Sequence, residues 1–177
     1  MPAGPLLKSP KCSALSESLY SQVPKEIEEN LVWRRELWQR SATDREFQQV
    51  LRDACREDLL FFVNAFCWTF DPRKPIPKLP FITWGFQDNS LLVLDEAMPT
   101  SQSRGHDVLI EKSRDMGASW MCLTLMFYRW MFRPMQSFLM VSRKEALVDG
   151  MADSLFSHMD FLLTGLPPWL APTTRRN

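Results

Sequence analysis

The chain has little of what a metal site or a disulfide framework needs. Its 177 residues include four cysteines and two histidines. The cysteines (Cys12, Cys55, Cys67 and Cys122) form no CxxC pair. Zinc ligands usually occur at short, fixed spacings, so this scatter excludes the common zinc motifs. We expect free thiols, as in a reducing cytosol.

The chain also has no excess of charge of either sign. Lys and Arg together number 21, as do Asp and Glu, which gives a formal net charge of +0. This balance offers no electrostatic argument for binding nucleic acid or a membrane surface. No apolar run approaches the roughly 20 residues that a membrane span needs. The N-terminus lacks the apolar region of a signal peptide, so we expect a soluble protein.

What the chain does contain is enough apolar sequence for one ordinary globular domain. Hydrophobic residues make up 45% and charged residues 24% of the sequence, which is typical of folded proteins. Residues 1–23 are rich in proline and serine and indicate a mobile leader. Residues 24–80 predict helices and then a proline-rich connector, and residues 81–177 predict an α/β unit.

The front part predicts helices and a buried aromatic segment. Pro24 suits a helix start, and Thr43 with Glu46 has the spacing of a capping box. Residues 61–70 (FFVNAFCWTF) predict a wall of the core, because large aromatic side chains dominate buried area. The prolines of residues 71–80 exclude a helix there. The first helix is expected to carry its apolar residues on one face: Ile27, Leu31, Leu37 and Trp38.

The second half predicts alternating strands and helices. We expect a helix over 87–98, a turn over 101–106, a strand over 107–111, a loop over 112–117, a helix over 118–132, a strand over 137–142 and a helix over 147–163. The last helix is expected to open with a capping box at Ser142 and Glu145. A strand–helix–strand order predicts parallel pairing with a right-handed connection.

The segment 107–120 carries the clearest chemical pattern. An apolar strand is expected to run into a polar loop, followed by Gly117 and by Ser119 at the start of a helix. This is the plan of a phosphate-binding loop, in which backbone amides face the anion and the hydroxyl reaches magnesium. The standard pattern GxxxxGK[ST] is only partly met, since Lys112 replaces the first glycine and Ala118 replaces the lysine. An ordinary strand–turn–helix connection remains the alternative.

The string EKSRDMGASW (111–120) resembles the variant Walker A loop of phage terminase large subunits, the ATPases that package double-stranded DNA into viral capsids. In some of those motors the lysine stands at the start of the loop, as Lys112 does here. The resemblance continues in the same order through FFVNAFCWTFDPR, LPFITWGFQ, SFLMVSRKEALVDG and DSLFSHMDFLLTGLPPWL, over residues 47–170. It implies an α/β fold, the N-terminal part of a P-loop NTPase domain of the additional-strand kind, preceded by helices.

The resemblance implies an ATP-binding set within the loop. Lys112 is expected to reach the β/γ-phosphates, and Gly117 is expected to let the backbone approach them. Ser119 is expected to coordinate Mg²⁺, so it is also the expected metal ligand. Ser113 and Ala118 complete the set of cofactor-binding residues in the loop.

Two further residues are assigned through the same resemblance. Arg114 matches an arginine that is a candidate catalytic residue, and a solvated loop arginine is the alternative. Gln87, which follows Phe86, is similar to a glutamine that contacts adenine, since its amide offers a donor and an acceptor. A polar surface residue at a helix start is the alternative for Gln87.

Residues 91–96 (LLVLDE) have the pattern of a Walker B box, with four apolar residues followed by Asp95 and Glu96. The box precedes the phosphate-binding loop, whereas Walker B follows it in these ATPases, and no turn separates it from Gln87. We therefore interpret it as the acidic end of a helix. The alternative is an unrelated nucleotide-binding protein in which Asp95 holds magnesium.

The resemblance implies ATP and Mg²⁺ as cofactors and the host cytoplasm as location. The implied partners are the terminase small subunit, the portal protein, double-stranded DNA and further subunits of an assembled motor. A whole terminase would continue through Walker B and a nuclease domain, neither of which is visible before Asn177. We therefore expect negligible ATPase activity from this chain alone. A non-catalytic module that contacts packaging proteins through residues 24–64 is the alternative from a different class.

Overall fold

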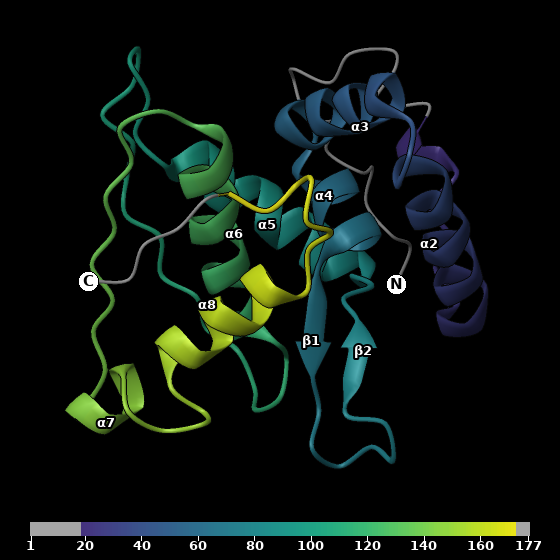
Figure 1. Cartoon of the computed structure of the whole chain (residues 1–177). Coiled ribbons are helices and arrows are strands. Elements are labelled where there is room, and N and C mark those ends of the chain that lie inside the picture. Colours follow the sequence, from purple (N-terminus) through teal and green to yellow (C-terminus); the bar gives the residue numbers. More distant parts are fainter. Residues whose placement is uncertain (1–18, 173–177) are drawn as a thin grey trace.

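The structure, a computed structural model, describes residues 19–172 and is mostly helical with one small sheet (Figure 1). Part of the expected leader, residues 1–18, lies outside the described residues. The named elements are α2 (Ile27–Ser41), α3 (Arg45–Glu57), α4 (Leu59–Phe66), β1 (Trp68–Phe70), β2 (Lys78–Pro80), α5 (Gly85–Ala97), α6 (Ala118–Phe132), α7 (Glu145–Val148) and α8 (Leu155–Thr164).

The core is built around α4, whose eight residues are all buried. This helix contacts α2, α3, α5 and α6. The Phe62 ring lies 6.3, 5.7 and 5.3 Å from the rings of Phe127, Tyr128 and Phe132 on α6. Aromatic rings at these separations attract one another beyond the area they bury. The core wall predicted for residues 61–70 is confirmed over 61–67, which are buried.

The helix α2 does not turn its expected apolar face to the core. Leu37 is buried, but Ile27 and Leu31 remain 48% and 40% exposed. The inward positions are taken instead by the buried polar side chains of Asn30 and Arg34. Both donate to the carbonyl oxygen of Asn64 near the end of α4, where a helix leaves carbonyl groups without partners. The need to satisfy these groups overrides the apolar periodicity.

The start of α3 differs from the prediction by one residue. Asp44 is the N-cap, and its side chain accepts a hydrogen bond from the Phe47 amide at 2.9 Å. The capping box predicted at Thr43 is therefore wrong. Aspartate and threonine are both good N-caps, and the adjacent aspartate takes this position.

The two central helices follow the sequence closely. The helix α6 has the predicted bounds, and α5 begins two residues before the predicted start at Gln87. Residues 91–96 lie inside α5, and the Asp95 carboxylate pairs with Arg129 of α6 at 2.6 Å. The Walker B alternative is therefore wrong, because the segment is helical and its carboxylate is engaged by a buried arginine.

The strands predicted over 107–111 and 137–142 are not formed. Among the described residues the only sheet is the antiparallel pair β1–β2, in which Trp68 lies opposite Pro80. Figure 1 shows the two predicted segments as extended chain on the side of the molecule away from α2, connected through α6. A strand needs a hydrogen-bonded neighbour, and no described segment pairs with either of them. The P-loop fold therefore stays a prediction.

The single helix predicted over 147–163 is also wrong. The chain forms α7, leaves the helical conformation at Asp149 and turns at Gly150, whose φ of 99° is readily adopted only by glycine. A new helix, α8, then starts at Leu155, and the side chain of its N-cap Ser154 accepts from the Ser157 amide at 3.3 Å. Ser142 does not cap a helix, since α7 begins after Lys144 without a side-chain cap.

Candidate functional site

The loop 112–117 leads from an extended segment into α6. Asp115 and Gly117 have positive φ values of 61° and 76°, so the backbone turns tightly just before the helix. Gly117 is the N-cap of α6 and supplies no side chain to its amides. The first hydrogen bond of the helix runs from the Met121 amide to the Gly117 carbonyl at 2.9 Å. The backbone amides that precede Met121 in this first turn of α6 donate to no acceptor among residues 19–172. Amides without a partner at the start of a helix can face an anion.

The amino end of α5 lies against this loop through Gln87. The Gln87 side chain is buried, and its Nε2 donates to the Met116 carbonyl at 3.2 Å. Its Oε1 accepts from the Trp84 amide at 3.1 Å, which fixes the side chain within its own helix turn. A methyl group added at Gly117 would lie 2.8 Å from Gln87 Nε2. The structure therefore brings together two of the residues predicted for the site, Gln87 and Gly117.

A polar cluster holds the start of α5 in place. The Thr83 hydroxyl hydrogen-bonds Asp88, and Lys25 Nζ lies 2.8 Å from Asn64 Oδ1 and 3.6 Å from Asp88 Oδ2. Tyr20 donates to the same carboxylate at 3.5 Å. Burial lowers the pKa of Lys25, and it raises that of Tyr20, to which the charge of Asp88 adds. This cluster joins the chain before α2 to α4 and α5, and so positions the first turn that carries Gln87.

The polar residues predicted for the loop point to solvent. Lys112, Ser113, Arg114 and Ser119 are exposed, while Ala118 is half-buried. Within residues 19–172, the side chains of Lys112, Ser113 and Arg114 make no hydrogen bond or ion pair. They are therefore free to meet a ligand at the start of α6.

One contact to the loop was missed by the sequence analysis. Arg73, in the connection between β1 and β2, pairs with Asp115 at 3.4 Å and with Asp71 at 2.8 Å. Its hydrogen bonds lower the pKa of the Asp71 carboxyl. Exposed pairs of this kind contribute little to stability. Nothing in the proline-rich sequence indicates that its arginine reaches a loop 42 residues away.

A second missed contact covers one side of the first turn of α6. The Trp120 ring stacks on His158 of α8, with ring centroids 4.4 Å apart. His158 Nε2 lies 2.9 Å from Asp153 Oδ1, and its Nδ1 is buried without a hydrogen-bond partner among the described residues. The separation of 38 residues hides this pairing from any local sequence pattern.

The described residues include no cluster of three His, Cys, Asp or Glu side chains arranged to hold a metal ion. The three described cysteines, Cys55, Cys67 and Cys122, are free, as predicted, and burial raises the pKa of each thiol. Cys12 lies outside the described residues. None of the helices between residues 19 and 172 has the length and apolarity needed to cross a membrane.

Comparison with protein-family models, with curated proteins and with solved structures finds no match for this chain. The function is therefore inferred from the residues of the chain and from their arrangement. The strongest observation is the contact between Gln87 and the backbone of the loop at Met116 and Gly117.

Proposed function

We propose that this chain is the N-terminal ATP-binding part of a viral terminase large subunit, the motor that packages double-stranded DNA into a capsid. The contact between Gln87 and the loop before α6 carries the proposal, because the resemblance to terminases places both in one nucleotide site. The order of extended segment, tight loop and helix also supports it.

The phosphate groups would lie at the start of α6. The unpaired amides of its first turn and the helix dipole favour an anion there. Lys112 and Arg114 are exposed and unpaired within the described chain, so both can turn toward that anion. Arg114 is the proposed catalytic residue, and it would counter charge that develops on the phosphoryl group. Ser113 and Ala118 would contribute through their backbone.

Magnesium would neutralise phosphate charge when bound together with ATP. Ser119 lies in the first turn of α6 with an exposed side chain, which is the place from which a hydroxyl can reach such an ion. Gln87 would hold the loop in the shape that receives the phosphates. We propose binding of ATP–Mg²⁺ by this chain, with negligible hydrolysis when it acts alone.

The proposal is tested by titration calorimetry with ATP–Mg²⁺. We expect saturable binding to the unaltered chain and an affinity lowered by about tenfold or more in Lys112→Ala, which loses a charged phosphate contact. Arg45→Ala is the matched control, because it removes one positive charge from an exposed position at the start of α3. Its affinity should equal that of the unaltered chain.

Two outcomes would contradict the proposal. One is the absence of ATP binding by a chain that circular dichroism shows to be folded. The other is an equal loss of affinity in Lys112→Ala and Arg45→Ala, which would indicate unspecific attraction of the nucleotide to positive charge. Steady hydrolysis that Lys112→Ala abolishes would contradict the expectation of negligible turnover, while leaving the binding site in place.

A further inference from the structure

The connection between β1 and β2 brings one arginine, Arg73, to the loop before α6. Figure 1 shows the connection and the loop at the same end of the molecule. Arg73 Nη1 donates to Asp115 Oδ2 at 3.4 Å, and Asp115 lies two residues before Gly117, the N-cap of α6. An exposed ion pair contributes little to stability, so its main effect is expected on the charge of the loop.

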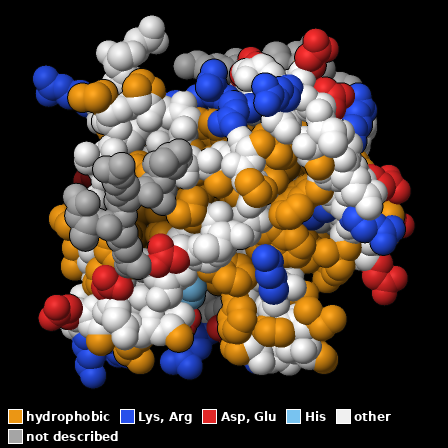
Figure 2. Space-filling model, viewed as in Figure 1, with side chains coloured by type: hydrophobic (Ala, Val, Ile, Leu, Met, Phe, Trp, Pro, Cys, Tyr) orange, Lys and Arg blue, Asp and Glu red, His pale blue; other side chains and the backbone are white. Residues whose placement is uncertain are grey.

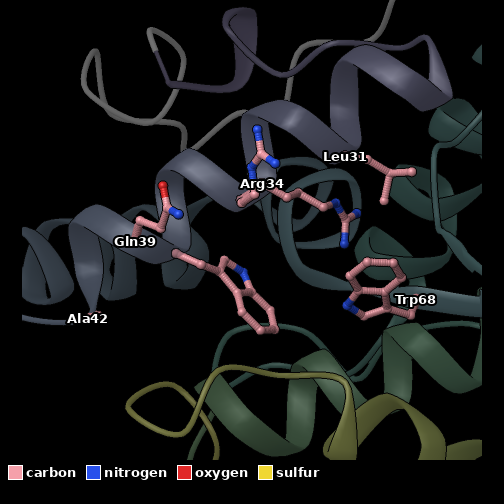
Figure 3. Close-up of a pocket in the computed structure, with 7 residues that line it drawn as sticks. Leu31, Arg34, Gln39, Ala42 and Trp68 are labelled. Atoms are coloured by element: carbon pink, nitrogen blue, oxygen red, sulfur yellow. The ribbon is translucent and has the colours of Figure 1, made fainter.

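The base of the β1–β2 hairpin is fixed to two helices. The centre of the Trp68 ring in β1 lies 4.8 Å from the guanidinium carbon of Arg34 in α2 and 4.7 Å from Nζ of Lys78 in β2. Figure 3 shows Arg34 reaching from α2 toward this ring. The Phe70 ring packs edge-to-face on Phe161 of α8, with centroids 5.9 Å apart. Figure 2 shows apolar side chains gathered between α2 and the hairpin, which is therefore presented in a defined position.

The guanidinium of Arg73 is oriented by two carboxylates. Its Nε and Nη2 donate to the two oxygens of Asp71 at 2.8 and 3.2 Å, while Nη1 donates to Asp115. The backbone amide of Arg73 also donates to Asp71 Oδ1 at 3.1 Å, so these two residues are held together within one turn. A bidentate pair of this kind fixes the plane of the guanidinium. The third nitrogen is therefore directed at the loop.

Asp115 is the one carboxylate of the loop 112–117, and its charge opposes the binding of an anion there. Within residues 19–172 its carboxylate accepts only from Arg73, and the amides at the start of α6 stay without an acceptor. Released from Arg73, the carboxylate would repel a phosphate group. It would also be free to turn toward these amides, since the start of a helix attracts negative charge.

Arg73 also supplies the excess of positive charge in this group of side chains. Lys112 and Arg114 are the exposed cations of the loop, and Asp71 and Asp115 are the two carboxylates that Arg73 engages. With Arg73 the cations outnumber the carboxylates, and without it the two kinds are equal in number. A polyanion is attracted only by the first of these two arrangements.

We propose that Arg73 is a positioning residue of the nucleotide site. It neutralises Asp115 and keeps that carboxylate from the first turn of α6, so that the loop accepts the phosphate groups of a nucleoside triphosphate. Arg73 acts through Asp115 and does not touch the nucleotide. The inference rests on the function proposed above, and it gives the proline-rich hairpin a part in that function.

Titration calorimetry with ATP–Mg²⁺ tests this role in the variant Arg73→Gln. We expect an affinity about fivefold lower than that of the unaltered chain, because the charge of Asp115 is then uncompensated. Adding Asp115→Asn to this variant should restore the affinity. Asparagine has the same size as aspartate, tolerates the φ of 61° at this position and carries no charge. A purely structural role of Arg73 would give no such recovery.

Lys74→Gln is the matched control, because it removes one positive charge from an exposed position of the same connection, where no described residue forms an ion pair with it. Its affinity for ATP–Mg²⁺ should equal that of the unaltered chain. Thermal melts of all variants should agree within a few degrees, since the altered side chains are exposed.

Two outcomes would overturn the role of Arg73 and leave the proposed function in place. One is ATP binding by the unaltered chain that Arg73→Gln does not weaken. The other is a loss of affinity in Arg73→Gln that Asp115→Asn does not restore, because the arginine would then act on another part of the chain. Absence of ATP binding by the folded, unaltered chain would contradict the proposed function, and this inference with it.

Discussion

Gln87 Nε2 donates to the Met116 carbonyl at 3.2 Å and so ties the first turn of α5 to the loop before α6. The opposite end of the same amide is also engaged, because Oε1 accepts from the Trp84 amide. The resemblance to terminases assigns this glutamine to adenine. The side chain is buried and uses one of its two N–H donors and one acceptor site within the chain, so we predict a positioning role for it.

Replacing Gln87 with leucine should weaken ATP and GTP binding to the same extent. Leucine has a similar size but cannot donate to Met116, so the loop loses one fixed point. We expect a loss of about fivefold in affinity for both nucleotides, corresponding to one hydrogen bond of about 1 kcal/mol. Calorimetric titrations with each nucleotide measure the two losses separately.

Ser90→Ala is the control for this substitution, because it removes a hydrogen bond to the Phe86 carbonyl on the exposed side of α5. Its nucleotide affinity should not change. If Gln87→Leu weakens ATP binding but spares GTP, the side chain reads the base, and the positioning role is wrong.

Gly117 and Gly85 should respond in opposite ways to alanine. At Gly117 a new Cβ would lie 2.8 Å from Gln87 Nε2, and the backbone has a φ of 76°. We expect Gly117→Ala to lower the free energy of unfolding by about 1–3 kcal/mol. At Gly85, in the first turn of α5, a Cβ meets no atom within 4 Å. Gly85→Ala should raise the free energy of unfolding by about 0.4–1 kcal/mol.

Urea denaturation of the two alanine variants measures both changes under one set of conditions. A loss at Gly85 similar to that at Gly117 would mean that the helix start tolerates no side chain at all. A neutral Gly117→Ala would show that the loop has another conformation in solution, with this residue in an ordinary helical or extended state.

The helices that bear the site follow from local sequence, and the contacts between them do not. The bounds of α6 follow from Gly117 and Pro134, which mark its two ends in the sequence. The strand predictions failed because a strand depends on a neighbour, and neither 107–111 nor 137–142 has one among the described residues. The contact of Gln87 with Met116 spans 29 residues and has no signature in either segment.

The error on α2 has a physical cause. Apolar spacing places Leu31 on the inner face, but Arg34 and Asn30 occupy that face because they satisfy carbonyl groups at the end of α4. No sequence pattern distinguishes a buried arginine that donates to carbonyl oxygens from any other arginine. Only the position of α4 beside α2 shows that these polar groups were needed.

Asp95 should stabilise the fold and take no part in binding magnesium. The Arg129 side chain is 6% exposed and donates through Nε to the Asp95 carboxylate at 2.6 Å. Asp95→Ala would leave that guanidinium buried without its counter-charge, and we expect a loss of about 2–3 kcal/mol in the free energy of unfolding. The affinity for ATP–Mg²⁺ should stay unchanged below the melting temperature of the variant.

Glu96→Ala is the matched control, because Glu96 is the adjacent carboxylate of α5 and is exposed. It should change stability by less than about 0.5 kcal/mol. Paired thermal melts and calorimetric titrations distinguish the two roles. If a folded Asp95→Ala chain has lost magnesium-dependent binding, Asp95 contributes to the nucleotide site and its purely structural role is wrong.

The buried thiols should make the fold sensitive to alkaline pH. Burial raises the pKa of Cys55 and of Cys67 well above the ordinary value, so the folded chain keeps both protons while the unfolded chain releases them above about pH 8.5. Stability from these groups is present below that pH and is lost as pH rises, by up to about 1.4 kcal/mol per pH unit for each thiol. Arg34 has the opposite effect on the free energy of unfolding. Because its pKa is lowered in the folded chain, its contribution to stability rises with pH above pH 9.

The double variant Cys55→Ala with Cys67→Ala isolates this effect. Both side chains are fully buried, so their truncation lowers the free energy of unfolding by the same amount at every pH. Urea denaturation at pH 7 and at about pH 9.5 should show a smaller fall in the free energy of unfolding than in the unaltered chain. Cys122→Ala, at a half-buried position, should change the pH dependence less. An equal fall in all three proteins would mean that the thiols titrate alike in the folded and unfolded chain, and that the loss at high pH comes from other groups.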